Sequence, residues 1–364
     1  MRVLMLCDVL FPQTTGGAGR VARELALALQ RRGSEVRFLT RATSGSSAQG
    51  ESETTYYPPP GKASPLEYRR IFQDIAADYR PDVLHVHQPL PAYLCLPRDV
   101  PNPVVQTFHS SWPEELKIKS SPWPLPFRRI WAGAFQMIEQ KTLRAADVIT
   151  VLSDYSRGVV ERHYHLSATI IPGGVDTRRF APIDVDRSDG LVRMATVRNL
   201  VPRMGLFELI EAMKLLPANF RLDIGGEGPL KARLQERLRS LGLEQKVRIR
   251  GHIPDDELPR FYSSADWFIL PTVAEEGFGL VILESLACGT PVLGTRVGAI
   301  PELLGRFDPA WVIPESKAAS IAETVLAAHR KSVPSRRELH EHVAREFDWD
   351  HIAAQYEQVY RSLV

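Results

Sequence analysis

Two glutamates with seven residues between them mark the most informative segment of the chain. Glu276 and Glu284 enclose Gly277-Phe278-Gly279-Leu280, which follows an apolar run and opens a helical pattern that Gly289 ends. The glycines leave backbone amides uncovered at the helix start, where the helix dipole attracts phosphate. Carboxylates accept hydrogen bonds from hydroxyls, so a ribose and a hexose suit the two glutamates. Either acid alone would be an ordinary helix-capping or exposed residue.

Two arginines lie in the first strand-to-helix loop of the same half. Arg198 and Arg203 fall within Val197–Gly205, after an apolar strand-like run. A guanidinium can span two phosphate oxygens, so this position suits neutralisation of a diphosphate, although solvated surface arginines would look the same. The glycines of Gly225–Gly228 either allow a ligand to approach the backbone or serve only as turn residues.

Short β-branched runs alternate with helical patterns along the whole chain, which indicates an α/β fold with parallel sheets. A polar stretch at 181–190 separates two doubly wound, Rossmann-like halves, and we expect them to face each other across a cleft. Residues 41–65 are rich in Ser, Gly and Pro and are expected to form an irregular exposed loop. The expected strands are 2–7, 35–40, 82–86, 103–108, 147–151, 168–171, 191–196, 220–224, 246–250, 266–270, 291–294 and 310–313.

The composition limits the classes of binding partner and the cellular compartment that we expect. The 364 residues carry a net charge of +2, so no overall field favours nucleic acid. No run approaches the ~18 apolar residues of a membrane span. Cys7, Cys95 and Cys288 form no CxxC pair and are expected to be buried thiols. We therefore expect a cytoplasmic protein, soluble or peripheral at the inner face of the membrane.

These motifs together resemble glycosyltransferase family 4, the retaining GT-B enzymes also called glycosyl transferases group 1. The resemblance spans nearly the whole chain. It implies an N-terminal acceptor-binding domain at 1–180, a donor-binding domain at 181–346, and a last helix at 347–364 that crosses back onto the first domain. The matching segments are Thr15–Arg20, Ile171–Asp176, Val201–Gly205, Gly225–Leu230, Glu276–Glu284 and the terminal Phe347–Tyr360.

The resemblance also implies roles for individual residues. Glu276 would contact the donor sugar, Glu284 would bind the ribose, and Arg203 would assist the helix-start amides in holding the diphosphate. His109, after the run Val104–Phe108, matches the family histidine near the reacting carbon. The implied catalytic residues are His109, Arg203 and Glu276; the implied donor-binding residues are Gly16, Gly17, Arg198, Arg203, Gly277, Phe278, Gly279, Leu280 and Glu284.

Two positions depart from the family pattern. Met204 stands where Lys is usual and Gly173 where Asn is usual. The first removes a cation from the diphosphate site, which would lower the stabilisation of the leaving group. We hypothesise that Arg198 or Arg20 partly substitutes for that cation.

The expected reaction is retaining transfer of a hexose-type sugar from a nucleoside-diphosphate sugar to a hydroxyl of a glycan, a lipid-linked acceptor or a small molecule. Two alternatives stay open: a nucleotide-sugar-binding subunit with weak or no catalysis, and a nucleotide-sugar epimerase on the same fold. A dehydrogenase is disfavoured because Gly16-Gly17-Ala18-Gly19 is not GxGxxG.

We expect no cofactor and no metal. His85, His87 and His109 lack a convincing acid or Cys to complete a ligand set, and Asp184-Val185-Asp186 and Asp348-Trp349-Asp350 only imitate the metal-binding DxD motif. The segment 116–131 mixes basic and aromatic residues, which suits an acceptor-pocket wall, a membrane interface or a lipid-linked acceptor.

Overall fold

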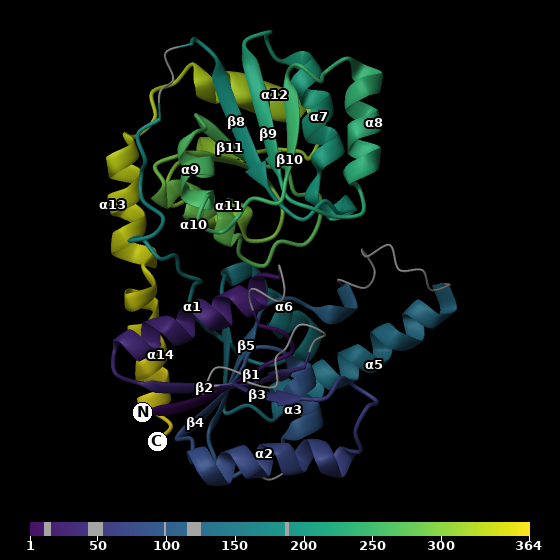
Figure 1. Cartoon of the computed structure of the whole chain (residues 1–364), viewed down its shortest axis with the longest axis vertical. Coiled ribbons are helices and arrows are strands. Elements are labelled where there is room, and N and C mark those ends of the chain that lie inside the picture. Colours follow the sequence, from purple (N-terminus) through teal and green to yellow (C-terminus); the bar gives the residue numbers. More distant parts are fainter. Residues whose placement is uncertain (11–15, 43–53, 98–99, 115–124, 186–188) are drawn as a thin grey trace. The chain divides into compact units, whose positions relative to one another are not determined.

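Parallel pairing joins all the strands in the computed structural model, which describes residues 1–10, 16–42, 54–97, 100–114, 125–185 and 189–364. The chain divides into a first unit, Met1–Gly174 with Trp349–Val364, and a second unit, Val175–Asp348 (Figure 1). Each unit is a Rossmann-like α/β layer structure around its own parallel sheet, as the sequence predicted.

The first unit contains a seven-stranded sheet in the order β3-β2-β1-β4-β5-β6-β7. Its central strand β1 (Arg2–Cys7) is buried from Val3 to Cys7, because a parallel sheet is covered on both faces. In Figure 1, α1 and α2 lie on opposite sides of this sheet. The remaining strands are β2 (Glu35–Arg41), β3 (Thr54–Tyr57), β4 (Val83–Val86), β5 (Val104–Phe108), β6 (Val148–Val151) and β7 (Thr169–Ile170). The described helices are α1 (Gly17–Arg31), α2 (Pro65–Tyr79), α3 (Pro89–Cys95), α5 (Leu125–Arg144), α6 (Asp154–Tyr164) and α14 (Trp349–Arg361).

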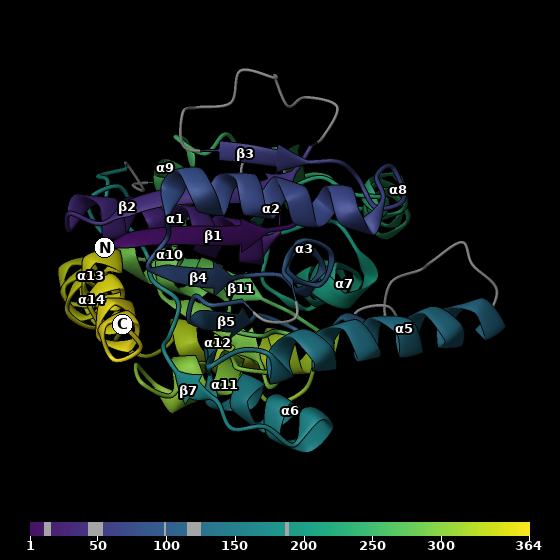
Figure 2. The same ribbon diagram turned by 90° about the horizontal axis from the view of Figure 1, so that it is seen from below.

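The last helix, α14, belongs to the first unit and packs against α1. Figure 2 shows it beside the amino-terminal end of β1. Arg31 pairs with Asp350 at 2.8 Å and Arg32 with Glu357 at 3.2 Å. The buried Tyr360 hydroxyl lies 2.6 Å from Nδ1 of His85 on β4. The ion pairs therefore join this helix to the end of α1, and the buried hydrogen bond joins it to the sheet.

The second unit repeats the arrangement with a six-stranded sheet in the order β10-β9-β8-β11-β12-β13. Its strands are β8 (Val192–Val197), β9 (Phe220–Gly225), β10 (Val247–Gly251), β11 (Trp267–Leu270), β12 (Val292–Thr295) and β13 (Val312–Ile313). Its helices are η1 (Pro202–Met204), α7 (Leu206–Leu215), α8 (Lys231–Leu241), α9 (Leu258–Ser263), α10 (Leu280–Ala287), α11 (Ile300–Leu304), η2 (Pro309–Trp311), α12 (Ala318–His329) and α13 (Arg336–Phe347).

One predicted loop is wrong. The stretch 41–65 contains β3, whose residues Thr54, Thr55, Tyr56 and Tyr57 pair with Phe38, Leu39, Thr40 and Arg41 of β2. The four-residue strand lies between a Ser- and Gly-rich segment and three prolines, so its two tyrosines are too short a run to predict a strand from composition. Tyr57 is nevertheless buried completely.

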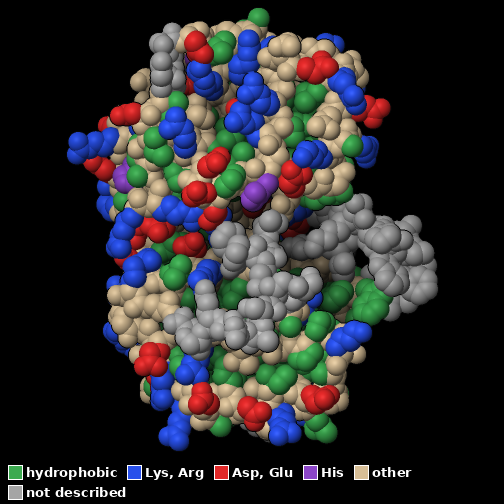
Figure 3. Space-filling model, in the orientation of Figure 1, with side chains coloured by type: hydrophobic (Ala, Val, Ile, Leu, Met, Phe, Trp, Pro, Cys, Tyr) green, Lys and Arg blue, Asp and Glu red, His purple; other side chains and the backbone are tan. Residues whose placement is uncertain are grey.

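The cysteines, the helices and the charged surface residues test three further expectations from the composition. All three cysteines are buried, as predicted. Among the described helices, none combines the length and the apolar character that a membrane span requires. On the face seen in Figure 3, basic and acidic side chains are interspersed.

We expect Tyr360→Phe to lower the free energy of unfolding by about 1–3 kcal/mol, because buried His85 Nδ1 loses its hydrogen-bond partner. Urea unfolding monitored by circular dichroism measures the loss. Tyr93→Phe on the surface of α3, where the tyrosine is 36% exposed, is the matched control and should change little. Equal stability of the two variants would contradict the prediction.

Candidate functional site

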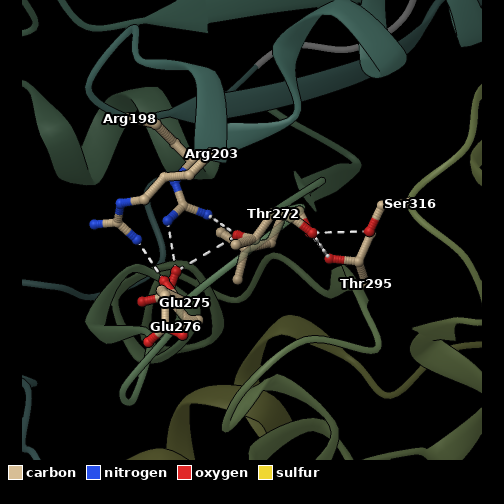
Figure 4. A network of polar contacts seen from close by, with 8 residues as sticks. Arg198, Arg203, Thr272, Glu275, Glu276, Thr295 and Ser316 are labelled. Atoms are coloured by element: carbon tan, nitrogen blue, oxygen red, sulfur yellow. Dashed lines mark hydrogen bonds and ion pairs between the residues drawn. The ribbon is translucent and has the colours of Figure 1, made fainter. Parts of the chain in front are cut away.

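The strand order of the second sheet brings two loops together. The order changes direction between β8 and β11, so the segments that leave these adjacent strands emerge at the same edge. The first carries Arg198 and Arg203, and the second carries Glu275 and Glu276 (Figure 4). The Val273 amide donates to the Arg203 carbonyl at 2.9 Å, which ties one loop to the other. Ligands of doubly wound sheets bind at such a change of direction.

The glycine-rich loop after β9 supports the arginine loop. Gly226 has a φ of 124°, and a Cβ at this position would lie 1.8 Å from the carbonyl oxygen of Arg198. The Leu200 amide donates to the Glu227 carbonyl at 2.8 Å. Gly226 therefore allows two backbone segments to approach closely, a reason that neither explanation given from the sequence contained.

Glu276 is held through its backbone as well as its side chain. Its carbonyl accepts a hydrogen bond from the Ala299 amide at 2.9 Å. Gly298, with a φ of 56°, lies so close that a Cβ would come within 2.1 Å of the same carbonyl oxygen. The preceding residue, Glu275, has a left-handed φ of 53°, and Arg203 donates to its carbonyl. The turn is therefore fixed from both sides.

The two predicted donor-site residues Arg198 and Glu276 contact each other directly. Arg198 Nη2 donates to Glu276 Oε2 at 2.5 Å, and its Nη1 donates to Thr272 Oγ1 at 2.6 Å. The side chains are 6% and 14% exposed, so this ion pair is largely withdrawn from solvent.

The second glutamate, Glu284, lies on α10 and is 5% exposed. Tyr262, on α9, donates its hydroxyl hydrogen to Glu284 Oε2 at 2.6 Å. At the start of α10 the N-cap residue is Gly279, and no side chain caps the helix. The first amides therefore meet no capping side chain, which leaves them suited to an anion.

Met204 closes the short helix η1 and is buried, at 5% exposure. The position at which the family usually has Lys is thus occupied by an apolar side chain inside the second unit. The neighbouring Arg203 keeps a positive charge in this loop, and its guanidinium donates to the neutral backbone carbonyl of Glu275.

His109, Gly16 and Gly17 belong to the first unit. His109 follows β5, and its Nε2 lies 3.2 Å from Nδ1 of the buried His87, which follows β4. Gly16 is the N-cap of α1 without a side-chain cap. A Cβ on Gly17 would meet no atom of the described residues within 4 Å, so packing against them does not explain this glycine.

Three histidines of the first unit, His85, His87 and His109, are neutral at physiological pH. Burial lowers the pKa of His109 to about 4 and, with the neighbouring His109, that of His85 to about 3. Burial, followed by the influence of His85 and His109, holds the pKa of His87 well below its ordinary value. His85 also lies 2.8 Å from the Thr107 hydroxyl. An uncharged His109 can donate or accept a hydrogen bond but supplies no positive charge.

Several contacts were not predicted from the sequence. Tyr262, Thr272 and Ala299 each hold a predicted glutamate, yet none carries a motif of its own. Within the described residues, no group of three or more His, Cys, Asp or Glu side chains is placed to hold a metal ion. Of the aromatic and basic segment 116–131, residues 116–124 lie outside the described residues, and Trp131 on α5 is 49% exposed.

Family models match both halves of the chain. Residues 15–179 match the model described as Glycosyltransferase Family 4, and residues 184–345 match the model described as Glycosyl transferases group 1.

Individual proteins are similar over different lengths. The phosphatidyl-myo-inositol mannosyltransferase of Mycobacterium leprae is 27% identical over 100% of this chain and 97% of its own length. The GDP-mannose-dependent alpha-(1-6)-phosphatidylinositol monomannoside mannosyltransferase of Mycolicibacterium smegmatis is 36% identical over 43% of this chain and 46% of its own. The sucrose-phosphate synthase structure from Thermosynechococcus elongatus aligns with a TM-score of 0.81 at 22% identity, covering 100% and 98% of the two chains. This structural likeness supports the GT-B fold.

The buried neutral histidines predict a loss of stability in acid. The pKa of His109 is about 4 when folded and about 6.5 when unfolded, so below pH 6.5 the unfolded chain binds more protons. The contribution of His109 to the free energy of unfolding is fully present above about pH 7. As the pH drops toward 4, this contribution falls by up to about 1.4 kcal/mol per pH unit.

The urea midpoint of unfolding, measured between about pH 7 and pH 5, should fall less steeply for His109→Asn than for the wild type. His351→Asn, which replaces an exposed histidine on α14, should keep the wild-type slope. The same slope in all three proteins would show that His109 is not held neutral.

Proposed function

Because the chain belongs to the glycosyltransferases of family 4 and group 1, we propose that it transfers a hexose-type sugar from a nucleoside-diphosphate sugar to an acceptor hydroxyl, with retention at the anomeric carbon. The proposed donor-binding residues of the second unit lie within the short segment Glu276–Glu284 or on the loop that carries Arg198 and Arg203. The observation that carries the proposal is the uncapped start of α10 beside two anchored carboxylates.

The site separates two kinds of contact. Anionic diphosphate oxygens would meet the amides of Phe278, Gly279 and Leu280 and the guanidinium of Arg203. Sugar and ribose hydroxyls would donate to the carboxylates of Glu276 and Glu284. This division suits a ligand that has a doubly charged centre between two hydroxylated rings.

In the proposed reaction, the bond from the anomeric carbon to the diphosphate oxygen breaks and the acceptor oxygen bonds to that carbon on the same face. The departing diphosphate takes the acceptor proton. The helix-start amides and Arg203 stabilise the charge that develops on the leaving group. Neutral His109 would orient a sugar hydroxyl by hydrogen bonding, and Gly16 and Gly17 would allow the first loop to approach the phosphates. No cofactor and no metal enter this scheme.

Buried Met204 favours a second candidate, a nucleotide-sugar-binding protein with weak catalysis. An apolar side chain at this position supplies no charge to the leaving group, which lowers transition-state stabilisation more than binding. An epimerase would use the same donor site but would alter the sugar without transferring it.

The names of the similar proteins suggest the donor and acceptor. Both mycobacterial relatives are mannosyltransferases with inositol-lipid names, and one is GDP-mannose-dependent. We therefore propose GDP-mannose as the first donor to test and a lipid-linked acceptor at the inner face of the membrane. Trp131 and Met137 on α5 are 49% and 57% exposed, and Lys141 lies over the half-exposed ring of Tyr93. Such apolar and basic groups suit an anionic membrane surface.

A panel of GDP- and UDP-sugars tests the proposed function. We expect release of one nucleoside diphosphate, formation of a product with the donor's anomeric configuration, and the same rate in excess EDTA. Coupled diphosphate release and NMR of the product measure these properties. Release of an inverted product would contradict retention, an altered free nucleotide sugar would indicate an epimerase, and binding without turnover would indicate the binding protein.

Sedimentation with vesicles of phosphatidylglycerol and phosphatidylcholine tests the membrane contact. Replacing Trp131 and Met137 with Ser should lower the bound fraction several-fold, because apolar area is lost from α5. Leu66→Ser on α2, where the leucine is 76% exposed, is the matched control and should bind as the wild type does. Equal binding of both variants, or no binding by the wild type, would remove the membrane proposal.

A further inference from the structure

We propose that His87 is a positioning residue that donates from Nδ1 to Nε2 of His109 and holds His109 in the tautomer whose remaining donor is Nδ1–H. This role rests on the proposed function, in which His109 orients a hydroxyl of the donor sugar. It is carried by the 3.2 Å contact between the two rings and by the buried position of the other His87 nitrogen, Nε2.

The ring of His87 is enclosed within the first unit. The residue follows β4 and is 2% exposed, and its backbone amide donates to the Leu6 carbonyl of β1 at 2.9 Å. Its ring centroid lies 4.1 Å from that of His85 and 5.5 Å from that of His109, which it stacks on at an interplanar angle of 25°. His87 therefore lies between a fully buried histidine and a partly exposed one.

Contacts with α14 and β5 fix His85, and through it the ring of His87. Nδ1 of His85 lies 2.6 Å from the hydroxyl of Tyr360, and Nε2 lies 2.8 Å from the hydroxyl of Thr107. Thr107 in turn lies 2.7 Å from the hydroxyl of Thr150 on β6. Because both nitrogens of His85 have partners, its ring cannot turn without the loss of a buried hydrogen bond. A neighbour that cannot turn restricts the orientation of the His87 ring stacked on it.

The positions of the ring hydrogens follow from the partners of His87. Both histidines are uncharged, so each ring has one N–H and one acceptor nitrogen. Two arrangements satisfy the contact: His87 Nδ1–H donates to His109, or His109 Nε2–H donates to His87. The second would place a hydrogen on His87 Nε2, which is sealed from solvent and has no hydrogen-bond partner among the described residues. A buried N–H without a partner is rarer in proteins than a buried acceptor without one, so the first arrangement holds.

His109 then offers a ligand one hydrogen-bond donor in a fixed place. Its Nε2 is occupied by His87, and its Nδ1 carries a hydrogen and forms no hydrogen bond with another described residue. The bond that one imidazole nitrogen makes sets which nitrogen is protonated. A fixed N–H requires an acceptor, and the oxygen of a sugar hydroxyl is one. His87 itself touches no part of the substrate and acts through the tautomer of His109.

Long-range ¹H–¹⁵N correlation spectra of protein labelled with ¹⁵N in histidine measure the tautomer, because the shifts of the two ring nitrogens show which of them carries the hydrogen. In the wild type without donor, at about pH 8, we expect both His87 and His109 to carry the hydrogen on Nδ1. Signals that disappear in His87→Asn and in His109→Asn identify the two rings. The spectrum of the wild type decides the tautomer whether or not a variant folds.

Amide side chains test the same geometry in catalysis. The amide of Asn places an N–H near the position of histidine Nδ1, and that of Gln places one near Nε2. His109→Asn should therefore keep more kcat/KM than His109→Gln. His87→Asn, which can still donate to His109, should keep most of the activity, whereas His87→Leu should lower kcat about tenfold through the loss of one hydrogen bond.

Binding of the diphosphate separates positioning from general damage to the fold. GDP and UDP have no sugar for His109 to contact, so His87→Leu should keep the Kd of the diphosphate that binds within about twofold. His351→Asn, which replaces an exposed histidine on α14, is the control and should match the wild type in both measurements.

A wild-type His109 with its hydrogen on Nε2 would overturn the assignment, and so would a greater loss of kcat/KM in His109→Asn than in His109→Gln. Wild-type activity of His87→Leu would show that His87 does not position His109. A wild type that shows the Nδ1–H tautomer but releases no nucleoside diphosphate from any sugar donor would overturn the proposed function alone and support the contact between the two histidines.

Discussion

Parallel strands place all their carboxyl ends at one edge of a sheet, and the contacts of the second unit depend on this constraint. Because β8 and β11 are neighbours at the change of direction, Arg198 and Glu276 meet although 78 residues separate them in the chain. The same constraint brings the Gly226 loop against the backbone of Arg198. A shift of one strand in the order would separate the arginines from the carboxylates, whatever the local sequence of each loop.

Two carboxylates beside an anion-binding helix start would ordinarily repel the ligand. The structure reduces that repulsion by different means at the two positions. Glu276 is paired with a guanidinium, so the pair presents no net charge. Glu284 is buried against the Tyr262 hydroxyl, a neutral donor. In the proposed donor site, the uncapped start of α10 and Arg203 then remain as the positive groups, which would allow phosphate and hydroxyls to be recognised a few residues apart.

The sequence predicted most strands of both sheets, because strands covered on both faces are nearly continuous apolar runs. It did not predict β3, whose Thr54–Tyr57 is short and adjoins prolines. At the site it identified Arg198, Glu276 and Glu284 but not their partners, since Thr272 and Tyr262 are recognisable only once distant segments are brought together. Gly226 shows the same limit: its φ and its contact with Arg198 are tertiary facts that a Gly-rich loop leaves open.

Each sheet has polar side chains where its strand order changes direction, but the charged groups at that edge differ between the two units. At the corresponding change of direction in the first unit, the Asp8 carboxylate is held by both Nε and Nη2 of Arg41, and the Asp8 amide donates to Gln88 Oε1. The nearby His87 and His109 are kept uncharged by burial. A neutral imidazole can align a hydroxyl without attracting the diphosphate to itself. In the proposed reaction, this leaves stabilisation of the departing charge to Arg203 and the start of α10, so catalytic strength depends on a loop in which Met204 contributes no charge.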